Sequence, residues 1–453
     1  MNDTDIFSRS IKEAVLQKIK PTPNEREHLS SIAKELMDFV NKTAEEQGLE
    51  DVYSKLVGSA ARGTWVSGTH DLDIFITFPE ETTRVELEKF GLSVARDVAK
   101  RADSFEERYA EHPYVNMSFQ GFDVDLVPCF RVSSSACIKS AVDRTPFHNE
   151  FIKQNISGLE DDVLLLKQFM RGGGVYGSEL RTQGFSGYLT ELLIVQFGSF
   201  ENVLKAVCDW YPGIEVDIKD HGMLKHEDPL VVIDPTDPKR NVAAALSLDR
   251  FCEFIDMSRR YFEGPSENFF FKDLVTPITD GELIENMQQR GSSFLAIVFK
   301  TPDVVEDVLY PQLYKMEHSA ASLLESNDFR VIKTRSWAGE ECVILLELLS
   351  SQLPTVKKHM GPPVWSRRHA ESFRLKYVDS VDVFSMYVEG GKYVVEIPRK
   401  FTSARDVIVS RLTTCSLGKH LNKAVGEGFQ VLVDDELCRL DYPDLRMFFR
   451  KWV

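Results

Sequence analysis

The spacing of hydrophobic and polar positions changes several times along the chain. Between residues 22 and 40 apolar residues recur at helical spacing, and the start Thr22-Pro23-Asn24-Glu25 has the N-cap, proline and glutamate of a capping box. Three short apolar runs follow, and they predict the strands of a small mixed sheet: residues 52–59, 71–78 and 122–130. We expect the last strand to stop at Pro128, because proline has no N–H for a neighbouring strand.

The later part of the chain has two further patterns. From about residue 155 to 265 the pattern is helical, apart from a break at three consecutive glycines. Beyond Pro265 the pattern changes to a β-α-β-β order, whose parts are residues 293–300, 304–326, 329–334 and 342–349. That order favours a ferredoxin-like or RRM-like module. The whole chain is therefore predicted to be a multidomain α+β protein.

Length and charge limit the function. A chain of 453 residues has room for about three domains. Its formal net charge of −16 argues against binding a polyanion over the whole surface, so any nucleic-acid contact has to be local. The seven cysteines form no CxxC pair, the first residues carry no apolar leader, and no stretch reaches roughly 18 apolar residues. We expect a cytoplasmic protein without disulfides or a membrane segment.

Two aspartates lie two residues apart at the start of an apolar strand. Side chains at this spacing share one face, so Asp71 and Asp73 repel each other unless a cation lies between them. Mg²⁺ prefers such oxygen ligands and shares them with substrate phosphates. Asp125 supplies a third strand carboxylate, but Asp123 lies on the same face, and periodicity alone does not choose between these two.

A candidate phosphate-binding turn precedes these aspartates. Gly58 ends a strand and permits close approach of a ligand, Ser59 supplies a hydroxyl, and Arg62 follows. Together with backbone N–H groups at a helix start, they are expected to form a cradle for a triphosphate. Three carboxylates beside such a cradle can hold two metal ions about 3.5–4 Å apart. This arrangement predicts transfer of a nucleotide to a 3′-hydroxyl, with pyrophosphate as the leaving group.

These residues belong to a longer series of motifs. Gly58-Ser59, Gly68 and Asp71-Leu72-Asp73 resemble the signature of the polymerase-β nucleotidyltransferase superfamily, and specifically that of the archaeal-type (class I) CCA-adding enzymes. Further motifs of that family match residues 124–129, 144–148, 166–167, 175–177, 184–188, 234–243, 359–365 and 369–371. The resemblance covers nearly the whole chain in the family's order.

The resemblance implies a template-independent enzyme that adds C, C and A to the 3′ end of tRNA from CTP and ATP, using two Mg²⁺ ions. It implies metal carboxylates at Asp71, Asp73 and Asp125, and so selects Asp125 over Asp123. Relatives often have Glu at the position of Asp71; the shorter Asp keeps the charge, so we expect a shifted ion and retained activity. The implied nucleotide-binding residues are Gly58, Ser59, Arg62, His148, Lys167, Tyr176 and Arg240.

The resemblance also implies a division of labour along the chain. It implies a polymerase-β-like catalytic head (1–150), a helical nucleotide-binding neck (151–265), and an RRM-like body and tail (266–453) that contacts the acceptor and T-arm end of tRNA. Arg240, together with backbone phosphates of the bound tRNA, is implied to select CTP and ATP over GTP and UTP. Whether two copies form a homodimer is left open.

Other interpretations fit single residues and the chain as a whole. His148 fits a loop histidine, Lys167 fits a snorkelling side chain, and Tyr176 fits a packing aromatic. A poly(A) polymerase or related RNA-tailing enzyme shares the carboxylates but extends with ATP alone. A non-catalytic RNA-binding protein is the second alternative for the whole chain. The intact aspartates argue against it, because concentrated negative charge beside RNA weakens binding.

A basic patch near the end of the chain is the predicted tRNA surface. Its cations are interleaved with Trp365, Phe373 and His369 and opposed only by Glu371: Lys357, Lys358, Arg367, Arg368, Arg374 and Lys376. The alternative is a solvated charged loop. The closing run Arg446 to Lys451 is a second, weaker candidate.

Overall fold

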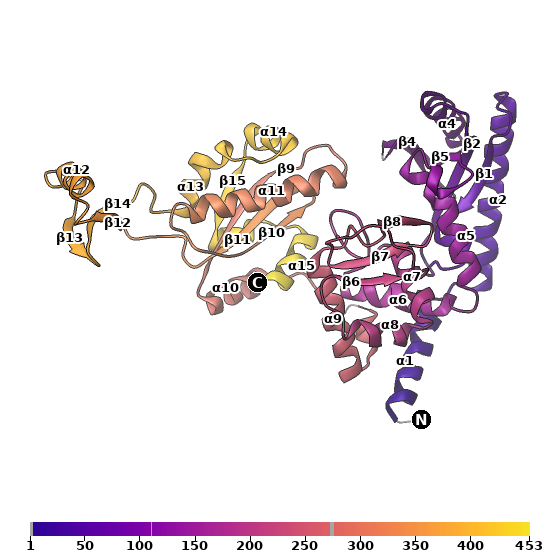
Figure 1. Cartoon of the computed structure of the whole chain (residues 1–453), viewed down its shortest axis with the longest axis horizontal. Helices are drawn as coiled ribbons and strands as arrows, with labels where there is room; N and C mark the ends of the chain where they lie inside the picture. Colours follow the sequence, from indigo (N-terminus) through magenta and orange to yellow (C-terminus); the bar gives the residue numbers. More distant parts are fainter. Residues whose placement is uncertain (1–2, 110, 272–275) are drawn as a thin grey trace. The chain divides into compact units, whose positions relative to one another are not determined.

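The computed structural model describes residues 3–109, 111–271 and 276–453. Contacts divide the chain into two units, Met1–Asp273 and Leu274–Val453, which Figure 1 colours from indigo to rose and from orange to yellow. Among the residues described, no helix is both long enough and apolar enough to cross a membrane.

A five-stranded mixed sheet forms the first part of the first unit. The elements of this part are α1 (Asp3–Ile19), α2 (Pro23–Glu46), β1 (Tyr53–Val57), α3 (Gly58–Arg62), β2 (Asp71–Pro79), α4 (Arg84–Ala99), β3 (Ser104–Tyr109), β4 (Pro113–Phe119), β5 (Phe122–Arg131) and α5 (Thr145–Asn155). The strand order is β1-β2-β5-β4-β3, and only the central pair β2–β5 is parallel. Helices α2 and α4 cover one face of the sheet (Figure 1).

Alternation along β2 makes one face of this sheet apolar. Leu72, Ile74 and Ile76 are buried in the core beneath α2 and α4. The side chains between them therefore point to the opposite face, and Asp71 and Asp73 are among these. The helix that covers the apolar side begins as predicted, because the Thr22 and Glu25 side chains form both hydrogen bonds of a capping box.

The prediction that β5 stops at Pro128 is wrong, because the strand continues to Arg131. Pairing of β5 with β4 already ends at Leu126, so the missing N–H of Pro128 breaks no hydrogen bond on that side. On its other edge β5 stays in register with β2, with Pro128 opposite Ile76. Proline is tolerated here because β4 is shorter than its neighbour.

The rest of the first unit contains helices and a small sheet. Its elements are α6 (Glu160–Gly173), α7 (Gly187–Phe197), α8 (Phe200–Val207), β6 (Ile214–Asp217), β7 (Leu230–Asp234), β8 (Asp237–Asn241) and α9 (Leu248–Glu263). The predicted helical pattern over 155–265 therefore missed a three-stranded sheet, β6-β7-β8. These strands have four or five residues each, too few for a periodic signal. Residues 242–247, which were predicted as helix, form a turn before α9.

The second unit is built on a four-stranded antiparallel sheet. Its main elements are α10 (Asp280–Arg290), β9 (Ser293–Lys300), α11 (Glu306–Glu325), β10 (Val331–Ala338), β11 (Glu341–Leu348), α13 (Ala404–Arg411), α14 (Lys419–Glu427), β15 (Gln430–Val433) and α15 (Pro443–Trp452). The spatial order β10-β11-β9-β15 is that of a ferredoxin-like fold, and the predicted β-α-β-β order is confirmed. Helices α11, α13 and α14 cover one face, and α10 and α15 cover the other.

A small lobe is inserted in this fold between β11 and α13. It consists of β12 (Val356–Pro363), α12 (Arg367–Tyr377), β13 (Ser385–Glu389) and β14 (Lys392–Pro398). The three strands form their own sheet, in the order β12-β14-β13, and α12 packs on β12 and β14. We call residues 356–398 the inserted lobe; it carries the predicted tRNA patch.

Candidate functional site

Four carboxylates share the face of the first sheet that α2 and α4 leave uncovered. The parallel register places Asp71 opposite Asp123 and Asp73 opposite Asp125. Neighbouring strands lie about 4.8 Å apart and residues two apart on one strand about 6.7 Å, so the four positions form a rectangle. Asp71 and Asp123 are exposed, and Asp73 and Asp125 are half-buried. The structure thus brings the three predicted metal carboxylates together, and Asp123 with them.

Gly58 lies directly against Asp73. Its φ of +72° lies in the left-handed region, and a Cβ built on it would lie 1.9 Å from Oδ2 of Asp73. Any other residue would be strained there and would displace the carboxylate. The short helix α3 starts at this glycine, with Ser59 in its first turn and Arg62 at its end.

Burial and mutual repulsion oppose ionisation of these aspartates. Burial, and after it the charge of Asp125, raises the pKa of Asp73 to about 6. Burial and then Asp123 raise the pKa of Asp71. Burial also raises the pKa of Asp125, although a hydrogen bond from Asn116 opposes this shift. A cation between the carboxylates would offset both burial and repulsion.

Asn116 on β4 holds two of the four carboxylates. Its Nδ2 donates to Oδ1 of Asp123 at 2.6 Å and to Oδ1 of Asp125 at 2.9 Å. In the described part of the chain, no three His, Cys, Asp or Glu side chains stand close enough to enclose a metal ion. The aspartates therefore share a face without forming a closed cage. Several carboxylate oxygens on one face nevertheless have the chemistry that suits Mg²⁺, which prefers hard oxygen ligands.

Two of the predicted nucleotide-binding cations contact one buried carboxylate. Nη2 of Arg62 lies 3.0 Å from Oε2 of Glu191, and Nζ of Lys167 lies 3.4 Å from Oε1. Glu191, on α7, is fully buried, and Lys167, on α6, is only 2% exposed. Lys167 therefore does not snorkel to the surface; its ammonium group stays inside the first unit.

Tyr176 lies beside this group. A Cβ built on Gly187 would lie 3.1 Å from the hydroxyl of Tyr176 and 3.9 Å from Nζ of Lys167, so both groups converge on the first turn of α7. The guanidinium group of Arg171 lies 5.0 Å from the ring centre of Tyr176. The residue is half-buried, and its hydroxyl lies against Gly187 at the start of α7.

His148 and Arg240 meet at another buried carboxylate, Asp234. Nε2 of His148 is 2.8 Å from Oδ2 of Asp234, and Nη1 of Arg240 donates to the same oxygen at 2.9 Å. The His148 ring also stacks on Tyr188, with centroids 4.0 Å apart. Burial alone would raise the pKa of Asp234, but the hydrogen bonds and charge of His148 and the bonds from Thr236 hold it well below its usual range. His148 is therefore an oriented side chain packed between two partners.

A pocket of about 700 Å³ lies beside Arg240. Its charged lining consists of three basic side chains, one carboxylate and a histidine: Arg144, Lys239, Arg240, Asp237 and His226. The surplus of basic groups favours an anionic ligand.

Three side chains with no predicted role help to build the site. Glu191 and Asp234 hold the cations, and Asn116 holds the carboxylates. Glu191 did have a signal, because it is a lone charge inside a helical run of apolar residues and needs a partner there. Asp234 ends an apolar run in the same way. Asn116 had no sequence signal, because its role depends on the register of β4 with β5.

The structure contradicts the alternative interpretation of the predicted basic patch as a charged loop. Its residues lie on β12 and α12, so they do not form a loop. Phe373 is partly buried, and its ring packs against those of His359, Tyr377 and Tyr393. Trp365 remains 76% exposed.

The basic patch is also opposed by more than Glu371. Glu389 pairs with Lys358 at 2.9 Å, and Asp328 lies 3.6 Å from Lys357. The closing run is less basic at its surface than predicted. Arg446 is only 4% exposed and donates to backbone carbonyls, and Arg450 pairs with Glu282.

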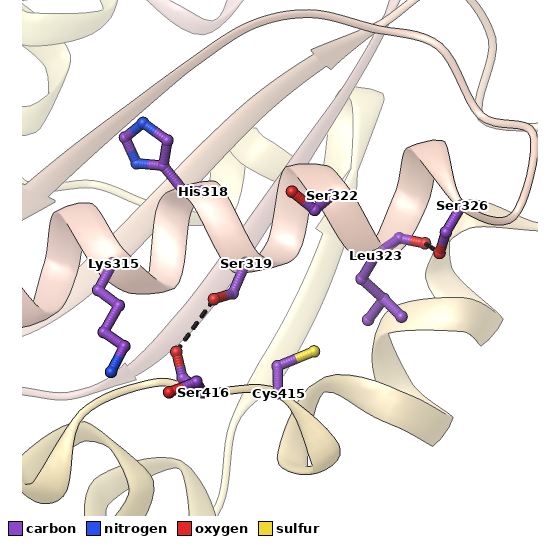
Figure 2. Close-up of a pocket in the computed structure, with 8 residues that line it drawn as sticks. All are labelled: Lys315, His318, Ser319, Ser322, Leu323, Ser326, Cys415 and Ser416. Carbon is purple, nitrogen blue, oxygen red and sulfur yellow. Dashed lines mark hydrogen bonds between the residues drawn. The ribbon is translucent and has the colours of Figure 1, made fainter.

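A separate groove lies on the second unit. Its volume is about 600 Å³. Figure 2 shows the residues that line it, on α11 and on the chain that precedes α14. Oγ of Ser319 donates to the carbonyl oxygen of Ser416 at 3.0 Å. The groove has no carboxylate and none of the predicted site residues.

Comparison with protein-family models divides the chain into three matched segments. Residues 36–148 match a model described as nucleotidyltransferase domain. Residues 161–271 match tRNA nucleotidyltransferase, second domain, and residues 290–434 match CCA-adding enzyme, C-terminal domain. Together these models cover well over half of the chain.

Curated relatives match over the full length. A protein of Methanosarcina acetivorans named CCA-adding enzyme is 60% identical over 100% of this chain and 99% of its own. One from Methanosarcina mazei with the same name is 58% identical over 100% of both chains, and one from Halobacterium salinarum is 42% identical over 98% of both. A solved structure of Cid1 poly (U) polymerase matches 60% of this chain at 12% identity and a TM-score of 0.47, and contributes nothing to the assignment.

We predict that Asp234→Asn lowers the free energy of unfolding by about 3 kcal/mol at pH 7, because it removes the shared anion of a buried ion cluster. The pKa of Asp234 is lower in the folded protein, so its contribution is full above the unfolded pKa near about 4 and is lost as pH falls. The difference between wild type and variant should therefore shrink below about pH 4. Urea unfolding followed at several pH values measures it.

Asp237→Asn is the matched control. Asp237 lies 3.3 Å from Arg144 in a partly exposed pair, so its loss should cost less than about 1 kcal/mol. Equal losses in the two variants would contradict a special role for Asp234.

Proposed function

The chain belongs to the CCA-adding enzymes, which are tRNA nucleotidyltransferases, and we propose that it adds C, C and A to the 3′ end of tRNA from CTP and ATP and releases pyrophosphate. Relatives named for CCA addition support this over the full length of the chain. The observation that carries the chemistry is the two facing pairs of carboxylates beside Gly58, because nucleotide transfer needs a metal site next to a triphosphate site.

We assign the metal site to Asp71, Asp73 and Asp125, with two Mg²⁺ ions as the cofactor. When bound, such ions supply activation of the attacking 3′-hydroxyl and neutralisation of the leaving pyrophosphate. The protein's own part is to orient the ligands. Gly58 leaves room for the Asp73 carboxylate, and Asn116 fixes one oxygen of Asp125 through a hydrogen bond.

We assign the triphosphate and sugar to the side chains around α3 and α7. Ser59 and Arg62 lie on α3, which begins at Gly58 against Asp73, and the charge of Arg62 opposes the rise that burial causes in the pKa of Asp73. Lys167 and Tyr176 converge on the first turn of α7. His148 lies near enough to Arg62 for that charge to lower its pKa, although burial lowers it more.

We assign base selection to Arg240. Asp234 accepts one of its N–H groups at 2.9 Å, which orients the planar guanidinium group, and 35% of the side chain remains exposed. Its other donors border the pocket with the surplus of basic groups. A guanidinium fixed in this way, together with backbone phosphates of the bound tRNA, presents a donor and acceptor pattern that suits C and A.

We propose that the head (1–150) catalyses transfer, the neck (151–265) completes the nucleotide site, and the body and tail (266–453) hold the acceptor and T-arm end of tRNA. The ferredoxin-like strand order of the second unit supports the last assignment, since RRM modules of this order bind RNA. The exposed cations of α12 support it too.

Incorporation of labelled nucleotides into a tRNA transcript without its 3′ CCA tests the function. With Mg²⁺, CTP alone should add two residues, and CTP with ATP should add one further A and then stop. Long tails from ATP alone would make the chain a poly(A) polymerase instead. A folded sample that binds tRNA but incorporates nothing would make it a non-catalytic RNA-binding protein.

Substitution of single aspartates separates the metal ligands from their neighbour. Asp73→Ala and Asp125→Ala should each lower the rate of incorporation by roughly a thousandfold or more while tRNA affinity stays nearly unchanged, because each removes a metal ligand. Asp123→Ala is the matched control, since Asp123 lies on the same face of the same strand, and it should retain most activity. A large loss in Asp123→Ala with a small loss in Asp125→Ala would reverse the assignment.

Charge reversal on α12 tests the tRNA surface. Arg368→Glu and Arg374→Glu should each weaken tRNA binding and lower the slope of log affinity against log salt by about 1, as expected for a lost phosphate contact. Lys358→Ala is the control: Lys358 is already paired with Glu389, so its loss should matter less. Unchanged affinity and slope in both arginine variants would remove α12 from the interface.

A further inference from the structure

Glu191 is a buried charge inside an apolar helix. Its neighbours on α7, Leu189, Leu192 and Leu193, are almost fully buried, and Glu191 itself is 0% exposed. A carboxylate that cannot reach water is tolerated only beside cations or hydrogen-bond donors. Burial alone would raise the pKa of Glu191, but Lys167, then Arg62 and then Thr64 lower it below its usual range. Glu191 is therefore ionised.

The partners of Glu191 come from two distant parts of the first unit. The hydroxyl of Thr64 donates to Oε1, and Nη2 of Arg62 lies 3.0 Å from Oε2. Arg62 is the last residue of α3, and Thr64 follows that helix. Lys167, from α6, lies 3.4 Å from Oε1 and also donates to the carbonyl oxygen of Thr64 at 2.9 Å. Glu191 thus connects α3 and the residues that follow it to helices α6 and α7.

The cluster leaves both positive charge and N–H donors unused. Two cations and one anion give a net charge of about +1. Lys167 has three N–H groups, of which one donates to Thr64 and one faces Glu191. Nη1 of Arg62 donates to Asn149 at 3.3 Å, while among the described residues its Nε, like Oε2 of Glu191, is buried without a hydrogen-bond partner. A buried donor without a partner, beside an excess of positive charge, points to an anionic ligand.

We propose that Glu191 is a positioning residue for the triphosphate: it anchors Arg62 and Lys167 so that their remaining N–H groups meet the phosphates. The proposal rests on the proposed function, because the nucleotide is the anion concerned. Without the charge of Glu191 the two cations repel each other, and Arg62 is free to turn toward the nearby carboxylate of Asp73. The two side chains would then keep their charge, but their N–H groups would no longer be oriented toward the phosphates.

Glu191→Gln tests this, because glutamine keeps the size of the side chain and still accepts the Thr64 hydrogen bond. Equilibrium binding of inorganic triphosphate to the full chain, without tRNA, should weaken at least about tenfold, as expected when a buried charged partner is lost. The KM for CTP should rise by a similar factor, with a smaller change in kcat and an unchanged Kd for tRNA.

Thr190→Val is the matched control. Thr190 is the buried neighbour of Glu191 on α7, and its hydroxyl contacts the Ser186 carbonyl and the Met170 sulfur, not the cations. The variant loses a buried hydrogen bond in the same helix and should bind triphosphate like wild type. Equal weakening in both variants, or wild-type affinity in Glu191→Gln, would overturn the proposal.

A second pair of variants decides the question if Glu191→Gln does not fold. Lys167→Met/Glu191→Met replaces a buried ion pair by apolar side chains, a change that proteins often tolerate. It should bind triphosphate more weakly than Lys167→Met alone, because Arg62 has then also lost its anchor; equal affinities would overturn the proposal. If the wild-type protein binds triphosphate but incorporates neither C nor A, the proposed function is refuted. The role of Glu191 in triphosphate binding is not refuted by that result.

Discussion

The parallel pairing of β2 with β5 is the constraint on which the rest of the site depends. It is the only parallel pair in a sheet whose other pairs are antiparallel, and its register puts Asp73 opposite Asp125. A shift by one residue would turn these carboxylates toward α2 and α4. Burial of Leu72, Ile74 and their neighbours under those helices fixes the register, at about 1.5–3 kcal/mol for each side chain.

Fixed register places like charges together, and other parts of the fold compensate for this. Gly58 makes room for one carboxylate, and Asn116 binds two others. The cations nearby are themselves held by buried anions, Glu191 for Arg62 and Lys167, and Asp234 for Arg240. Buried ion pairs contribute little net stability, but breaking one is costly. Such a pair therefore keeps a side chain in one orientation.

The two units differ in the solvent exposure of their basic side chains. In the first unit the predicted nucleotide-binding cations Arg62, Lys167 and Arg240 are partly or fully buried, and each has a defined partner. In the inserted lobe the cations of α12 are exposed on a surface that also exposes Trp365. Buried, oriented cations suit a small ligand that binds in one geometry. An exposed basic helix suits the phosphate backbone of a nucleic acid, where its side chains replace the mobile counterions.

The sequence by itself determined the features that depend on near neighbours. The capping box at Thr22, the strand that carries Asp71 and Asp73, and the β-α-β-β order of the second unit follow from local periodicity. Family membership also came from the sequence alone, because its motifs recur in order along the chain. Local patterns failed where an element was short, as in the sheet β6-β7-β8, or where a neighbouring strand set the limit, as at Pro128.

Only the tertiary structure decided which distant side chains meet. Glu191 and Arg62 are far apart in sequence, and nothing local says that the carboxylate of one holds the guanidinium group of the other. The same holds for Phe373, whose ring packs against other rings of the lobe, and for Arg446, which donates to carbonyl groups. The physical reason is that a buried charge or ring is defined by what surrounds it, and those surroundings are assembled by long-range packing.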